Sequence, residues 1–244
     1  QAGVLGLDFA TEGPMRIGNK TGSYLVNYRY STLSLVAKLG VPLGDAVTNF
    51  QDLSFNCWMP AGKAGTFTLF GMGGLSLQTQ EGKADSLAWE KDLYSQYQGR
   101  FGANTGVLGL THSIILSNNT YLKTVIAASG TDNVDNGFLY QKDYSLRKEW
   151  EERHLQNKIT VSTVLNHKWN ARHLLRTGAW VSSLNYNLSQ ANLDASSEQL
   201  VQQVKTTGTT QTLNAFAQWQ YRISPKMTLN TGLHGFMLFL NDTW

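Results

Sequence analysis

The five histidines are the first residues to consider for metal or acid–base chemistry. They are His112, His154, His167, His173 and His234. Their spacing does not match that of the ligands in common zinc sites, although His167 and His173 flank a tight turn. Two histidines beside a turn are more often solvated or interfacial than metal-bound. We therefore expect no metal site and no cofactor.

Two acidic groups could support other chemistry. Residues 132–137 contain Asp132, Asp135, Asn136 and Gly137, as a calcium loop would, but Val134 occupies a position that needs an oxygen ligand. A protease-like site could be assembled from acidic residues of the expected loops and a histidine, namely Asp85, Glu90, Asp92 and His154. Any four loops offer such a set, so it carries little information. We expect that the protein is not an enzyme.

A third group contains polar residues that alternate with apolar ones along extended segments. Its members are Asp8, Asn27, Arg29, Arg176, Arg222 and His234. Because successive side chains of a strand point to opposite faces, these residues point away from their apolar neighbours. They are candidates for lining a water-filled lumen or for pairing with a plug domain, and the sequence does not separate the two roles.

The elements that position these residues are best seen in residues 212–240. Two arms meet at residues 224–226, where Pro225 favours a tight turn. Each arm alternates between apolar and polar residues and exceeds the roughly 9 to 11 residues that a tilted strand needs to cross a bilayer. Trp219 and Tyr221 lie near the turn, where a membrane interface would be. This hairpin predicts a transmembrane β-barrel.

The rest of the chain repeats this pattern in about ten strands. Short turns are expected near residues 16–22, 60–65, 117–120, 170–173 and 224–226. Between them we expect long loops at 32–49, 79–98, 130–153 and 189–210, with short helices within 32–49 and at 196–204. Short turns at one end and long loops at the other are typical of outer-membrane barrels, whereas a soluble β-sandwich has no reason to sort its loops in this way.

Aromatic and charged residues agree with a barrel. The aromatic residues near the short turns are Tyr24, Trp58, Tyr121, Trp169, Trp219 and Tyr221. Parity places Arg29, Lys158, Arg176 and Arg222 on the inner face, whereas Lys123 shares its parity with Tyr121 and Val125 and is ambiguous.

Composition limits the alternatives. The 244 residues are 15% charged and 41% hydrophobic, and no segment approaches the roughly 18 apolar residues of a spanning helix. The net charge of +3 is small and the basic residues are scattered, so we expect no nucleic-acid partner. The predicted fold class is therefore all-β, an antiparallel transmembrane up-and-down β-barrel.

Five segments carry a resemblance to a known family, namely residues 23–35 (SYLVNYRYSTLSL), 48–55 (TNFQDLSF), 104–112 (NTGVLGLTH), 120–131 (TYLKTVIAASGT) and 214–222 (NAFAQWQYR). They resemble the barrel of TonB-dependent outer-membrane receptors, in the branch with a carboxypeptidase-regulatory-like N-terminal extension. The resemblance implies an outer-membrane barrel of about 22 strands around a plug, with TonB as a partner through a plug segment that this chain lacks. Residues 1–244 would then be one partial barrel domain, truncated at both ends.

The resemblance implies energy-coupled uptake of a scarce nutrient, whose identity the residues do not give. The alternative is a complete small barrel of about ten strands that acts as an outer-membrane enzyme or porin. Both interpretations place the chain in the outer membrane of a Gram-negative type of cell, in contact with its lipid.

Overall fold

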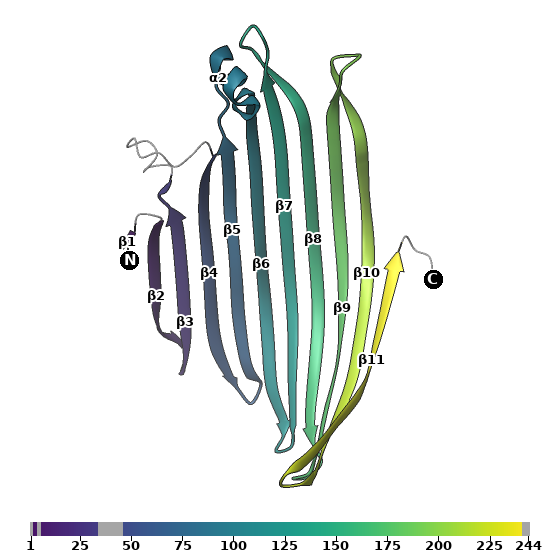
Figure 1. Ribbon diagram of the computed structural model, residues 1–244. Coiled ribbons are helices and arrows are strands. Elements are labelled where there is room, and N and C mark those ends of the chain that lie inside the picture. Colours follow the sequence, from purple (N-terminus) through teal and green to yellow (C-terminus); the bar gives the residue numbers. More distant parts are fainter. Residues whose placement is uncertain (1, 4–5, 34–45, 241–244) are drawn as a thin grey trace.

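The computed structural model describes residues 2–3, 6–33 and 46–240, which form one antiparallel sheet (Figure 1). Its eleven strands lie side by side in chain order. The strands are β1 (Ala2–Gly3), β2 (Gly6–Ile17), β3 (Lys20–Ser31), β4 (Ala46–Gly62), β5 (Gly65–Gln80), β6 (Tyr97–Ser117), β7 (Thr120–Tyr140), β8 (Leu146–Lys168), β9 (His173–Asp194), β10 (Gln199–Ser224) and β11 (Met227–Leu240). The prediction of an all-β, antiparallel, up-and-down fold is confirmed.

All five predicted short turns are present at one end of the sheet (Figure 1). They are the links 18–19, 63–64, 118–119, 169–172 and 225–226. Gly18 and Gly65 have φ values of 59° and 84°, which glycine adopts without a steric penalty. Asn170 accepts hydrogen bonds from the backbone N–H groups of Arg172 and His173 at 2.9 and 3.1 Å and so closes the four-residue turn. Turn chemistry therefore fixes this end of the sheet.

The opposite end differs from the sequence prediction at two loops. The loops predicted at 130–153 and 189–210 are wrong, because the strands continue to short links at 141–145 and 195–198. Within the first of these predicted loops, Arg153 of β8 forms two 2.9 Å hydrogen bonds to Asp132 of β7. Charged side chains thus pair across the part of the β7–β8 ladder that was expected to be a loop. In the second, the helix predicted at 196–204 is replaced by a turn and the start of β10, which is rich in β-branched residues.

The link after β5 is residues 81–96, slightly shorter than the predicted 79–98, and it holds two short helices. These are α2 (Ser86–Lys91) and η1 (Leu93–Gln96), and each begins at an aspartate whose side chain accepts from a backbone N–H two residues later at 3.0 Å. Trp89 of α2 stacks near Tyr140 of β7, with ring centroids 6.3 Å apart. No helix in the described part of the chain is long and apolar enough to span a membrane. The helix predicted within 32–49 falls largely on residues 34–45, outside the described residues.

Cross-strand register assigns every strand residue to one of two faces. We call one the apolar face and define it by a row of seven residues in mutual register: Cys57, Leu69, Leu110, Ile126, Val161, Val181 and Leu213. We call the other the polar face, and its adjacent row contains Asn56, Phe70, Gly109, Ala127, Thr160, Ser182 and Thr212. The predicted period of two therefore runs across the whole sheet.

In the described part of the chain, no second protein layer packs against the apolar face. Among the described residues, the buried ones are Ser31, Ala191 and four glycines without side chains, Gly22, Gly71, Gly109 and Gly137, whereas Ile126 is 52% and Ile159 56% exposed. A single sheet with no core is not stabilised by its own packing, so this face requires an apolar solvent. Strands β2 to β11 have 12 to 26 residues, which is enough to cross a bilayer. The predicted outer-membrane location is confirmed, and lipid covers the apolar face.

Both outer strands of the sheet have an open edge. β11 pairs only with β10, and β1 covers β2 only at Gly6 and Leu7, so in the described residues no ladder joins β11 to β2. Unpaired strand edges are not tolerated in lipid, because their backbone groups find no hydrogen-bonding partner there. The edges must therefore be paired in the membrane. The prediction that residues 1–244 are a single domain truncated at both ends stays a prediction.

Candidate functional site

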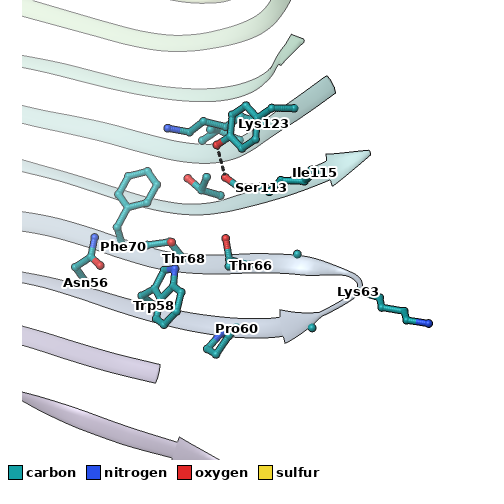
Figure 2. Close-up of a pocket in the computed structure, with 15 residues that line it drawn as sticks. Asn56, Trp58, Pro60, Lys63, Thr66, Thr68, Phe70, Ser113, Ile115 and Lys123 are labelled. Atoms are coloured by element: carbon teal, nitrogen blue, oxygen red, sulfur yellow. Dashed lines mark hydrogen bonds between the residues drawn. The ribbon is translucent and has the colours of Figure 1, made fainter. Parts of the chain in front are cut away.

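One hollow lies on the polar face beside the short turns (Figure 2). It measures about 950 Å³ and spans β4, β5, β6 and β7. Side chains from each of these strands project into it, including Asn56 and Trp58 of β4, Thr66, Thr68 and Phe70 of β5, Ser113 and Ile115 of β6, and Lys123 of β7. Four neighbouring strands thus contribute to one surface.

The hollow combines aromatic, hydroxyl and cationic groups. Trp58, Phe70 and Tyr121 provide its ring surfaces. The Tyr121 hydroxyl donates to Ser113 Oγ at 3.0 Å, which fixes the phenol across the β6–β7 ladder. Lys123 is exposed and lies in register with Ser113 on one side and Val164 on the other. Such a surface can bind the apolar body and the negative charge of a small solute together.

Two glycines shape this end of the sheet. Gly109 lies opposite Phe70, and a Cβ at this position would be 2.3 Å from Phe70 Cζ. Glycine therefore provides the space that the Phe70 ring occupies. At the β4–β5 turn, a Cβ on Gly65 would be 2.1 Å from the backbone oxygen of Ser113, so this turn closes tightly against β6.

A second hollow, of about 690 Å³, lies farther from the short turns and involves residues of β3 to β9. Arg29 and Asp52 line it and form an ion pair, with Nη2 2.8 Å from Oδ2. The Arg29 guanidinium also lies over the Phe50 ring, 5.1 Å from its centroid. Gln156 and Lys158 contribute from β8. Charge in this region is thus partly compensated.

The six candidate residues all fall on the polar face, in two groups. Asp8 lies directly opposite Arg29, and Asn27 lies next to this pair, opposite Ser54. The second group is on β9 to β11. There Arg176 is opposite Asn166 and Gln218, Arg222 is opposite Thr228, and the His234 ring lies 6.1 Å from the Trp180 ring. Their predicted role in lining a lumen stays a prediction.

The aromatic residues near the short turns lie on both faces of the sheet. Trp219, Tyr221 and His173 form a stacked cluster on the apolar face, with the His173 and Tyr221 centroids 4.5 Å apart. Trp58 and Tyr121, grouped with them in the sequence, lie instead on the polar face, because they are in register with Thr68 and Asn166 respectively. The ambiguous Lys123 lies there too.

The sequence alone does not single out the residues that line the first hollow. Alternation alone places Trp58 on the other face of its strand from Cys57, and Phe70 on the other face from Leu69, so their shared face could have been predicted. Their convergence depends on the exact register between β4 and β7, which alternation does not determine. Among the described residues, no group of three or more histidine, cysteine or acidic side chains is placed to hold a metal ion.

Comparisons with known proteins add the following. No family model and no curated protein matches the chain. Among solved structures, the Pseudomonas putida toluene transporter TodX is 13% identical with a TM-score of 0.37, over 97% of this chain and 74% of that protein. The CymD monoaromatic hydrocarbon channel is 8% identical with a TM-score of 0.29, over 96% of this chain and 82% of that protein. Similarity at this level carries neither substrate nor mechanism to this chain.

These comparisons correct the resemblance to TonB-dependent receptors. No family model supports it, and the solved structures named above are a transporter and a channel rather than such receptors. The predicted role in energy-coupled nutrient uptake and the predicted partnership with TonB are therefore wrong. The sequence segments on which the resemblance depended are amphipathic strands, a pattern that all transmembrane barrels share.

Proposed function

We propose that this chain forms the wall of a small outer-membrane pore through which small solutes pass without energy coupling. The observation that carries the proposal is the two-faced sheet, whose strands all alternate between a lipid-facing side and a side rich in hydroxyl, amide and charged groups. A polar interior is what a water-filled barrel requires. The chain performs no chemistry on the solute in this proposal.

The proposal includes closure of the sheet by pairing between β2 and β11. Adjacent strands are antiparallel throughout, so β2 and β11 run in opposite directions and can form one more antiparallel ladder. Their lengths are similar, at 12 and 14 residues. Closure would give ten long strands, an even number, as in bacterial single-chain barrels.

Entry of solutes into liposomes that contain the protein tests whether it forms a pore. The full chain, refolded into phospholipid liposomes, should admit small neutral sugars and cause osmotic swelling, whereas empty liposomes and liposomes with heat-denatured protein should not swell. Absence of swelling with a correctly inserted, protease-resistant sheet would overturn the proposal.

A further inference from the structure

Charged residues on the polar face are sorted along the strands. We define the short-turn half of this face as the row through Asn56 and Phe70, extended on β2 to Glu12, together with all positions between that row and the short turns. The charged strand residues in this half are Glu12, Arg16, Lys123, Lys168, Arg176 and Arg222. Five of these six are basic, although acidic and basic residues are nearly equal in number in the whole chain.

These basic residues have no acidic neighbours across the ladders. Lys123 faces Ser113 and Val164, Arg176 faces Asn166 and Gln218, and Arg222 faces Thr228. In the described part of the chain, none of the three forms an ion pair with a carboxylate. Their positive charges are therefore available to a solute.

The other half of the polar face differs. Arg29 is paired with Asp52 and lies opposite Asp8, and His154 Nε2 is 2.6 Å from Glu152 Oε1. Asp135 lies directly opposite Glu152, which adds negative charge. A solute moving along this face would therefore pass from a mixed region into one of uncompensated positive charge.

A wall of one sign of charge concentrates counter-ions, especially where low-dielectric lipid surrounds it. We propose that the short-turn half of the pore selects anions, and that its hollow binds small organic anions with an apolar body. Lys123 supplies the charge, and Trp58, Phe70 and Tyr121 supply the apolar surface. This inference rests on the proposed pore, because the polar face must enclose a lumen.

Reversal potentials across a planar lipid bilayer measure the selectivity. With a potassium chloride gradient, the full chain should show a chloride to potassium permeability ratio of roughly three or more. Lys123→Glu combined with Arg176→Glu should lower this ratio below one. The matched control is Lys205→Glu, which reverses a charge on the apolar face near the long-loop end and should leave the ratio unchanged.

The bound solute is tested with hexanoate and acetate at equal concentration. Hexanoate should reduce chloride current at least severalfold more strongly than acetate, because only hexanoate has an apolar body long enough to contact the rings. Lys123→Gln should weaken this block, and Lys205→Gln, which removes a charge from the apolar face, should retain it. Equal block by the two anions would overturn the ligand class.

The possible failures are distinct. If no variant conducts, the pore itself is wrong. If the protein conducts but prefers potassium, or if Lys205→Glu shifts the ratio as much as the double variant, the pore stands and the inferred selectivity is wrong. If the anion preference is present in charged lipid but disappears in uncharged lipid, the preference comes from the lipid head groups, and the inference is wrong.

Discussion

Arg29 binds Asp52 across the β3–β4 ladder, with its Nε and Nη2 atoms 2.9 and 2.8 Å from Asp52 Oδ2. Both side chains are substantially exposed, at 51% and 37%. An exposed ion pair of this kind stabilises a fold by about 1 kcal/mol or less, so it contributes little to the stability of the sheet. Its effect on a pore is to compensate one positive charge outside the short-turn half.

Removing the acidic partner should therefore change selectivity more than stability. Asp52→Asn releases the Arg29 charge into the polar face and should raise the preference for chloride over potassium, with a change in unfolding free energy of about 1 kcal/mol or less. Reversal potentials and urea unfolding in detergent measure the two quantities. An unchanged reversal potential would indicate that Arg29 does not face the conducting path.

Adjacent residues of β3 test the assignment of faces. Val26→Arg places a charge on the apolar face and should cost about 2 to 4 kcal/mol near the bilayer midplane. Asn27→Arg introduces the same side chain on the polar face, opposite Ala10 and Ser54, and should be tolerated. The measurement is the folded fraction after insertion into liposomes, read from heat-modifiable gel migration. Similar losses in both variants would contradict the assignment.

The β4–β5 turn should be intolerant of a side chain at Gly65. Gly65→Ala adds a Cβ at a φ of 84° and 2.1 Å from the Ser113 backbone oxygen, so we expect a loss of roughly 2 kcal/mol or more in stability. Gly235→Ala is the control, because nothing lies within 4 Å of its added Cβ. Unfolding midpoints in urea compare the two. Equal midpoints would show that the turn relaxes at little cost.

Acid should loosen the β9–β10 turn, which lies outside the membrane-spanning segments. The Ser196 hydroxyl, with the backbone N–H groups of Ser197 and Ser196, lowers the pKa of Asp194 to about 2. The unfolded value is about 3.9, so the contribution is fully present above about pH 4 and is lost as the pH falls toward 2.

Hydrogen exchange of the Ser196 and Ser197 amides should therefore accelerate, beyond the intrinsic pH dependence, as the pH falls from about 4 to 2. Asp194→Asn should show weaker protection at pH 6 and should lack this additional acid transition. An identical acid transition in the variant would assign the effect to another group.

Closure of the sheet can be tested by cross-linking β2 to β11. In a Cys57→Ala background, single cysteines at Phe9, Thr11 or Gly13 are combined with cysteines at Leu233, Gly235 or Met237. These positions all lie on the apolar face, so a β2–β11 ladder should bring at least one pair within disulfide distance. Intramolecular disulfides in membrane-inserted protein are expected. Intermolecular disulfides alone would contradict closure within one chain.

The alternation of apolar and polar residues predicted most of this architecture. Lipid on one face and polar groups on the other impose a period of two, and this period is visible in the sequence of each strand by itself. Val26 and Asn27, or Leu213 and Asn214, are assigned correctly by parity alone. Turn residues such as Gly65 and Asn170 mark the strand ends for equally local reasons.

Other features depend on contacts between distant residues. The extension of β7 and β8 beyond the membrane includes the Asp132–Arg153 pair, and a run of charged residues resembles a loop when each is considered alone. The convergence of Trp58, Phe70 and Tyr121 likewise depends on register across three ladders. The family resemblance failed because amphipathic strands are common to barrels with different functions.

Single-channel recording of two neighbouring substitutions on β6 tests the pore most directly. Thr111 lies on the polar face, in register with Thr68 and Val125, whereas Leu110 lies on the apolar face. Thr111→Trp should narrow the lumen and lower the conductance at least severalfold, while Leu110→Trp should leave it unchanged. Equal conductance in the two variants, or a reduction only in Leu110→Trp, would contradict a pore lined by the polar face.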